Sequence, residues 1–213
     1  MCIRDSARLL HYIEQSGVYA ALAPGDFMGD LPPVNQNTQL KLPLFLCPTD
    51  PTKEINPNAK NYAKSNYAVS LLVAPVHNQT TGAWPKLRIA NITDGTSNTF
   101  MIGERDMKRG LGAVYIGRIH NITDAVAYGR ADLPMNTAYA GGSDANCTRH
   151  CWTSLHTGGG VNFAFCDGSV RFVADNIETH KGYTQSCAGV VNTANFLYQN
   201  LYRIDDGFTV TLP

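Results

Sequence analysis

The stretch that most constrains the fold is 156–172, which reads HTGGGVNFAFCDGSVRF. The apolar side chains of Val161, Phe163 and Phe165 alternate with smaller or polar ones, so one face of this run would be apolar, as in a half-buried strand. An Asp-Gly pair follows at Asp167–Gly168 and leads into a second apolar run. Asp-Gly is a strong hairpin signal because a type I′ turn needs positive φ at both central residues. The sequence therefore predicts a β-hairpin with a two-residue turn.

The glycines before the first strand and the histidine before them allow several kinds of chemistry. His156 and Asp167 could form a catalytic pair, with Ser154 nearby, but no nucleophile elbow is present and no cysteine has a protease-like context. A phosphate-binding loop is excluded because the glycines lead into a strand and no lysine follows. We therefore expect no catalytic residue, and expect His156 to hydrogen-bond a turn or backbone group, approached closely across Gly158 and Gly159.

Composition narrows the class of protein further. The chain has 213 residues, which suits a single domain, and its 17 basic and 17 acidic residues give zero formal charge. No basic stripe carries exposed aromatics, so nucleic acid is not an expected partner. The 19 glycines and 11 prolines favour short strands and turns over a helical bundle. No run approaches the ~18–20 apolar residues of a membrane span.

Local patterns predict one helix followed by many strands, an α+β fold with a mainly antiparallel sheet. A helix is expected in 5–20, with Leu9, Leu10, Tyr12 and Ile13 near one face and a stop at Gly17. Strands are expected in 40–51, 65–74, Thr99–Gly103 and 110–117, with a turn at Asp94–Gly95 before the third of them. The C-terminal part is expected to form a helix at 194–202, a turn at Asp206–Gly207 and a final strand. Residues 106–150 are predicted to be a loop-rich surface insertion in this single domain.

Six cysteines favour an exported protein in an oxidising compartment. Four potential zinc ligands, Cys147, His150, Cys151 and His156, lie close together, but no matched second pair follows, so no metal site is expected. A disulfide is the preferred alternative, either Cys147–Cys151 or one of these two joined to Cys166 or Cys187. Cys47 would be either buried and free or a bridge partner.

Six segments in order carry a resemblance that covers nearly the whole chain: ARLLHYIEQSGVY, FLCPTDP, NYAVS, ITDGTSNTFMIGER, HTGGGVNFAFCDGSVRF and YQNLYRIDDG. Together they resemble the planctomycete-type family of prepilin-like proteins, which is named for a His-X9-Asp-Gly motif and is otherwise of unknown function. The motif residues that match are Cys47, Pro48, Asp50, Asp94, Gly95, Thr96, Ser97, Asn98, Glu104, His156, Gly158, Gly159, Asn162, Asp167 and Gly168.

The resemblance implies a protein similar to type IV pilins and type II secretion pseudopilins. Such a protein is non-enzymatic and exported, is anchored in the inner membrane by an N-terminal helix, and assembles with other pilin-like subunits or secretion-system proteins. The 213 residues would then be its globular head, which begins at the end of the long helix. We expect the leader and membrane helix to be absent from this sequence, and residues 1–6 to be foreign to the head.

One departure from the family motif concerns spacing. Ten residues separate His156 from Asp167, where the family has nine. A one-residue slip would turn every side chain of a strand to its other face. We therefore expect the glycines before Asn162 to absorb the extra residue in a bulge or wider turn.

Two other functions remain open. An extracytoplasmic solute- or glycan-binding module would use Trp84, Trp152 and the 106–150 insertion as a recognition surface, although buried tryptophans are the preferred interpretation. A structural calcium ion is the remaining alternative, and no EF-hand spacing supports it. Its candidate ligands are Asp94, Asp124, Asp144, Asp205 and Asp206.

Overall fold

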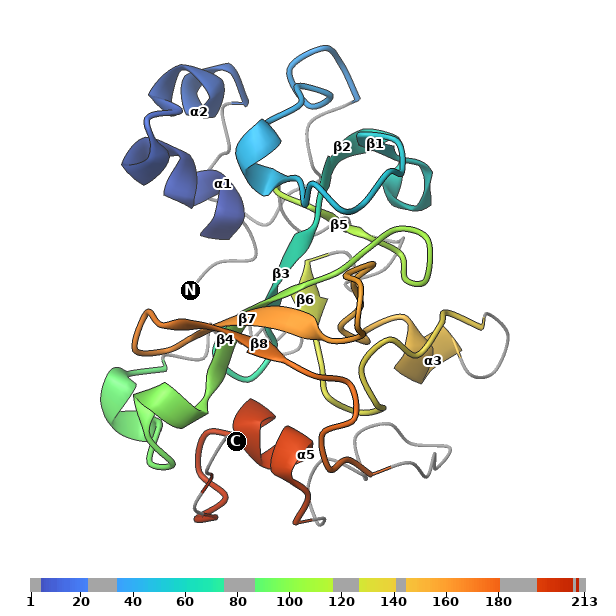
Figure 1. Cartoon of the computed structure of the whole chain (residues 1–213). Coiled ribbons are helices and arrows are strands. Elements are labelled where there is room, and N and C mark those ends of the chain that lie inside the picture. The colour runs from blue at the N-terminus through green and yellow to red at the C-terminus, as the bar shows by residue number, and fades with distance from the viewer. Residues whose placement is uncertain are drawn as a thin grey trace.

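The computed structural model describes residues 5–22, 34–74, 87–116, 127–140, 145–180, 195–208 and 210. The chain has an α+β fold, as predicted, with a short helical N-terminal segment and two mainly antiparallel sheets (Figure 1). The described α-helices are α1 (Asp5–Leu9), α2 (Ser16–Leu22), α3 (Ala145–Thr148) and α5 (Leu197–Tyr202). None of them combines the length and apolarity that crossing a membrane requires.

The larger sheet has five strands in the order β6-β3-β4-β7-β8, and the smaller has three in the order β1-β2-β5. All pairs are antiparallel except β3 with β6. The strands of the larger sheet are β3 (Tyr67–Ser70), β4 (Phe100–Glu104), β6 (Tyr128–Gly129), β7 (Val161–Phe165) and β8 (Val170–Val173). Those of the smaller sheet are β1 (Ile55–Asn56), β2 (Tyr62–Ser65) and β5 (Ala113–Val114).

The first of two large hydrophobic clusters covers one face of the five-stranded sheet. Phe163 and Phe165 of β7 are fully buried, which confirms the alternation predicted for this strand. Phe100 of β4 stacks on Phe163 with 3.8 Å between ring centroids. Tyr198 of α5 and Trp152 belong to the same cluster, so the C-terminal helix packs against the sheet (Figure 1).

The second cluster lies beside the smaller sheet and receives the N-terminal segment. Ala7 of α1 and Leu10 have no exposed surface, and both pack in a cluster that contains Phe45 and Tyr115. The rings of Phe45 and Tyr115 stack with 5.0 Å between their centroids. The predicted helix is therefore partly correct, but it is broken at Glu14, which adopts the left-handed conformation at φ 61°.

Other details of the N-terminal half differ from the prediction. Gly17 lies inside α2 and does not end a helix, and Tyr12 is 84% exposed. The strand predicted in 40–51 is absent, and a 3₁₀ turn occupies Pro43–Phe45. Proline fixes φ near −65°, which suits the first residue of such a turn better than a paired strand.

The β7–β8 hairpin is present, but its turn is longer than predicted. Ala164 pairs with Val170, and the backbone N–H of Phe165 donates to Ser169, which leaves a loop of Cys166, Asp167 and Gly168. Only Gly168 of these has positive φ, at 86°. This is the hairpin in which a type I turn is followed by a left-handed glycine, so the predicted two-residue type I′ turn is wrong.

The described parts of 106–150 are not a surface insertion. They supply β5 and β6, and Ala131 and Met135 are buried in the first cluster. Small and polar residues can fill a core when their backbone groups are paired, so the abundance of glycine and aspartate in the segment was misleading. In the predicted final strand, Phe208 is not in a strand, and 209 and 211–213 lie outside the described residues.

Candidate functional site

The chain passes from the smaller sheet to the larger one at a buried residue, Asn66, which lies between β2 and β3. Its side-chain Oδ1 accepts from the N–H of Cys47 at 2.9 Å, and its Nδ2 donates to Oδ2 of Asp50 at 2.6 Å. Its carbonyl accepts the N–H of Arg105 at 2.6 Å, and its own N–H donates to the carbonyl of Phe45. Asn66 therefore ties the Cys47–Asp50 loop to the end of β4.

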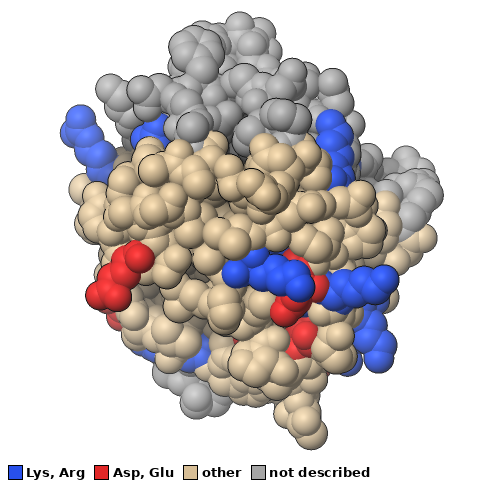
Figure 2. All heavy atoms as spheres, turned by 90° about the horizontal axis from the view of Figure 1, so that it is seen from above, with Lys and Arg blue, Asp and Glu red and all other residues tan. Residues whose placement is uncertain are grey.

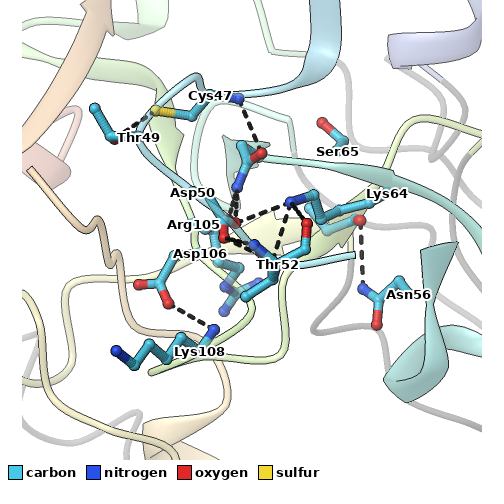
Figure 3. Close-up of polar contacts among 12 residues, drawn as sticks. Cys47, Thr49, Asp50, Thr52, Asn56, Lys64, Ser65, Arg105, Asp106 and Lys108 are labelled. Atoms are coloured by element: carbon cyan, nitrogen blue, oxygen red, sulfur yellow. Dashed lines mark hydrogen bonds and ion pairs between the residues drawn. The ribbon is translucent and has the colours of Figure 1, made fainter. Parts of the chain in front are cut away.

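A buried ion pair adjoins Asn66. Lys64 Nζ lies 3.1 Å from Oδ2 of Asp50, and both side chains are 2% exposed (Figure 3). Lys64 also donates to the hydroxyl and carbonyl of Thr52. Burial raises the pKa of Asp50, but hydrogen bonds from Thr52, Asn66 and Lys64 outweigh it and hold that pKa below its usual value.

The guanidinium of Arg105 is also fully buried and binds backbone carbonyls. It donates to Cys151 at 3.3 Å, to Tyr128 at 3.0 Å and to Arg149. Desolvation lowers the pKa of Arg105 to about 10, which leaves it charged at neutral pH. Arg105 thus holds β6 and the segment after α3 against β4.

The His156 ring meets Glu104 at the C-terminal end of β4. Its Nε2 lies 2.9 Å from Oε1 and 3.0 Å from Oε2 of Glu104. The same nitrogen lies 3.1 Å from Nδ2 of Asn162 and 3.9 Å from Sγ of Cys47. Oε2 of Glu104 also accepts the N–H of Asn162 at 2.7 Å. Four motif residues from distant segments therefore converge, which we call the His156 cluster: Cys47, Glu104, His156 and Asn162.

The expected bond from His156 to a turn or backbone group is replaced by these side-chain contacts. The other ring nitrogen, Nδ1, lies 3.4 Å from the hydroxyl of Thr49. A nucleophilic triad needs the base to face the nucleophile with one ring nitrogen and the orienting acid with the other. Here Nε2 faces both Cys47 and Glu104, so the arrangement is not that of a triad.

The His156 cluster is closely packed on the side of Cys47 and Glu104 that faces Asn66. Cys47 and Glu104 line a void with no room for a water-sized sphere, together with Asp50, Asn66, Arg105 and Ser154. A substrate needs a cleft beside the reacting groups. A groove of about 630 Å³ borders Cys47, Asp50 and Lys64, but neither Glu104 nor His156 lines it. The contacts of Glu104 and His156 are therefore bonds between segments of the chain.

Asp167 lies in a second group of contacts, at the other end of the same strands. Its N–H donates to the carbonyl of Thr96, and its carboxylate accepts from the N–H and hydroxyl of Ser169. Hydrogen bonds from the Ser169 hydroxyl and N–H hold the pKa of Asp167 below its usual value. His156 and Asp167 are thus separated by the length of β7 and form no shared site.

At the same end of the strands, Asp94 binds the backbone of the C-terminal segment. Its carboxylate accepts the N–H groups of Asp206 at 2.7 Å and Gly207 at 2.9 Å. Asn98 donates to the Asp94 carbonyl from a 3₁₀ turn, Thr96–Asn98, that includes Ser97. The predicted turn at Gly95 is present, with φ at 98°. Both oxygens of Asp94 are therefore used by the backbone, and Asp124 and Asp144 lie outside the described residues.

Three consecutive glycines connect His156 to β7. Gly158, Gly159 and Gly160 all have positive φ, at 97°, 74° and 138°. A Cβ on Gly160 would lie 2.5 Å from the Val173 carbonyl oxygen, so this glycine is required where the loop crosses β8. The loop is where the extra residue is expected, and the strand that follows it keeps its alternation.

The cysteine predictions are partly wrong. Cys47, Cys151 and Cys166 are free thiols, so neither Cys147–Cys151 nor a bridge to Cys166 forms. Burial raises the pKa of Cys151 to about 12 and that of Cys166 to about 11, which keeps both protonated. Cys187 lies outside the described residues.

The other candidate residues are spread over the molecule. His150 stacks on Tyr128 at 5.0 Å and does not join His156. Trp152 is fully buried, as preferred, and is unavailable as a sugar-binding surface, while Trp84 lies outside the described residues. Pro48 is exposed beside Cys47.

Sequence reasoning missed Lys64, Asn66 and Arg105. Asn66 lay in the strand predicted at 65–74 and Arg105 lay two residues beyond the strand predicted at Thr99–Gly103, and neither was singled out. Charged or amide residues within otherwise apolar strand sequences were the available signal, because such groups are buried only when they are paired.

Comparison with known proteins gives one match. No curated protein and no solved structure has significant similarity to the chain. A family model described as "Protein of unknown function (DUF1559)" matches residues 6–180, which include the whole His156 cluster and the β7–β8 hairpin. The chain therefore belongs to the DUF1559 family of proteins of unknown function.

Proposed function

We propose that the chain is the globular head of a prepilin-like protein of the cell envelope, with a structural or assembly role in a type II secretion or type IV pilus-like system. The observation that carries this proposal is the orientation of the motif side chains. Glu104, His156 and Asp94 bind other parts of the chain, and Asp50 does the same at the edge of a groove. Residues used in this way support a scaffold, and we propose no enzymatic activity.

The N-terminal segment supports the same role. It docks on the second cluster through Ala7 and Leu10, which are fully buried. In a pilin-like protein the preceding part of the helix would extend from this point to the membrane and to neighbouring subunits. Seen from above, the described surface is mostly uncharged, with Lys and Arg lying singly or beside Asp and Glu (Figure 2). That face suits protein neighbours better than a polyanion.

Export to an oxidising compartment implies a disulfide. Three of the six cysteines are free thiols, so Cys147 can pair within the chain only with Cys187 or Cys2. We propose Cys147–Cys187, which would close a loop that begins at α3 and ends before α5.

The test uses the full-length gene product, tagged at its C-terminus and expressed in its native host. Deleting the prepilin peptidase should leave a slower-migrating precursor in the inner membrane, and crosslinking of the wild type should capture pilin-like subunits. A protein that is not processed and remains in the cytoplasm would contradict the proposal.

A solute- or glycan-binding module is the second candidate, favoured by one groove. This groove of about 440 Å³ lies between β8 and α5 and is lined by Phe172, Ile177 and Leu197, with Arg171 and Glu178 as polar groups. An apolar groove with a few polar groups is typical of small-molecule sites. Soluble glycans that bind the wild type but not Phe172→Ala would favour this function.

A further inference from the structure

The His156 cluster contains three side chains whose donor atoms suit a transition-metal ion. The thiol of Cys47, a carboxylate oxygen of Glu104 and a ring nitrogen of His156 all lie within 4.8 Å of one another. Cys47 and His156 are 109 residues apart and Glu104 is 52 residues before His156, so no local spacing motif announces the set. The folding of the chain alone brings these ligands together.

With the Asn162 amide as placed, the hydrogen bonds around Nε2 of His156 cannot all be satisfied. If Nε2 of His156 carries a proton, it can donate to Glu104 but then faces the Asn162 amide N–H group at 3.1 Å. If Nε2 is unprotonated, it accepts from Asn162 but turns a lone pair toward the carboxylate. Rotating the Asn162 amide by half a turn exchanges its oxygen and nitrogen. Four lone-pair donors then point at one place: the thiolate, the carboxylate, Nε2 and Oδ1 of Asn162.

We propose that Cys47, Glu104 and His156 bind a divalent metal ion, preferentially Zn²⁺, with Asn162 or a water molecule in the fourth position. Zinc prefers four ligands drawn from Cys sulfur, His nitrogen and carboxylate oxygen. Bond lengths of about 2.0–2.3 Å place tetrahedral ligands roughly 3.3–3.8 Å apart. Two of the separations here, 2.9 Å from Nε2 to Oε1 and 3.9 Å from Nε2 to Sγ, differ from these values by about 0.5 Å, and all three ligand atoms lie within 4.8 Å of one another.

Charge and access also fit a bound cation. A thiolate and a carboxylate supply two negative charges, and the buried ammonium group of Lys64 is paired with Asp50. The His156 side chain is 20% exposed, whereas that of Glu104 is 5% exposed. The ion would therefore enter past the His156 ring and be held against β4.

The ion would have a structural role. It would join the Cys47–Asp50 loop, the end of β4 and the loop before β7, three segments that adjoin Asn66 or the hairpin. Structural zinc stabilises a fold directly because the site does not exist in the unfolded chain. This inference does not depend on the pilin-like assignment.

The experiment uses the purified, reduced 213-residue chain after treatment with EDTA. We expect one Co²⁺ per chain to bind with a thiolate-to-metal charge-transfer band in the near ultraviolet, and Zn²⁺ to displace it. Saturating Zn²⁺, at about 100 times its Kd, should raise Tm by roughly 5–10 °C. Cys47→Ser should abolish the band, and Glu104→Gln and His156→Asn should each weaken binding at least about 10-fold.

Two control variants locate the site. Cys166→Ser removes a free thiol outside the cluster and should leave the band, the stoichiometry and the Tm shift unchanged. Cys151→Ser should also keep the band, because Cys151 is a free thiol outside the cluster. Circular dichroism of each metal-free variant establishes that it is folded. A wild type that binds no Co²⁺, or a band that survives in Cys47→Ser, would overturn the proposal.

Discussion

Nε2 of His156 lies 2.9 Å from Oε1 of Glu104, a residue 52 positions earlier in the chain. Glu104 ends β4, and β7 pairs antiparallel with β4, so the start of β7 is brought to the end of β4. The same pairing carries Asp167 to the other end, beside Thr96. The number of residues between His156 and Asp167 is therefore set by the length of one strand plus its glycine loop, and not by the geometry of a shared reaction centre.

Asp50→Asn should lower the free energy of unfolding by about 3–5 kcal/mol, because it leaves the buried ammonium of Lys64 without its counter-charge. Urea denaturation at pH 7 measures the loss. Adding Lys64→Met to Asp50→Asn should recover part of the loss, since the uncompensated charge is removed. A single variant within about 0.5 kcal/mol of the wild type would show that the pair is not buried as described.

Gly129→Ala should destabilise the protein by about 1–3 kcal/mol. A Cβ at this position of β6 would lie 2.4 Å from the Trp152 ring, which is fully buried and has no room to move. Gly17→Ala is the matched control: nothing lies within 4 Å of its Cβ position inside α2, so the change should stabilise by up to about 1 kcal/mol. Thermal unfolding of both variants compares them, and equal Tm values would contradict the packing around Trp152.

Asp132 should make stability fall as pH rises from about 4 to 7. Burial raises the pKa of Asp132 to about 6, although Arg130 at 3.0 Å opposes the rise. The native state therefore keeps this proton where the unfolded state has lost it. The favourable contribution is complete below the unfolded pKa near 4 and is lost as pH passes through 6, at a cost of about 3 kcal/mol.

Asp132→Asn isolates this effect, because asparagine does not ionise. The difference in unfolding free energy between Asp132→Asn and the wild type should grow in favour of the variant by up to about 3 kcal/mol between pH 4 and pH 7.5. Urea titrations at four pH values measure it. A difference that stays constant with pH would mean that Asp132 titrates normally.

Peptide mapping under non-reducing conditions should find Cys147 linked to Cys187 in protein secreted to an oxidising compartment. The bridge closes a loop of about 40 residues and should add roughly 4 kcal/mol of stability by limiting the unfolded chain. Cys47, Cys151 and Cys166 should react with a thiol reagent after denaturation without reduction, since all three are free. A Cys147–Cys151 peptide would contradict the structure.

Alternation and turn residues were sufficient to predict several elements. The pattern of Val161, Phe163 and Phe165 predicted β7 and its buried face, and Asp94–Gly95 predicted the turn before β4. These succeed because a strand and a tight turn are decided by neighbours in the sequence. The length of the hairpin turn could not be predicted in this way, because Asp-Gly fits both the two-residue turn and the left-handed end of a three-residue turn.

The candidate site could be listed from the sequence but not assembled. Cys47, Glu104, His156 and Asn162 were all matched as motif residues, yet their contacts depend on the pairing of β4 with β7 and on the link at Asn66. Lys64 and Arg105 were missed because their burial depends on partners far away in sequence, Asp50 and the carbonyls of 128–151. Long-range polar contacts of this kind leave no periodic signal.

The central claim is that the motif residues hold the fold together, and a double-mutant cycle on Glu104 and His156 tests it most directly. Unfolding free energies of the wild type, Glu104→Gln, His156→Asn and the double variant would be measured in urea with EDTA present. The account predicts that the single losses exceed 1 kcal/mol and that their sum exceeds the loss in the double variant by about 1–3 kcal/mol. Single losses below about 0.5 kcal/mol that simply add would contradict a structural role for this pair.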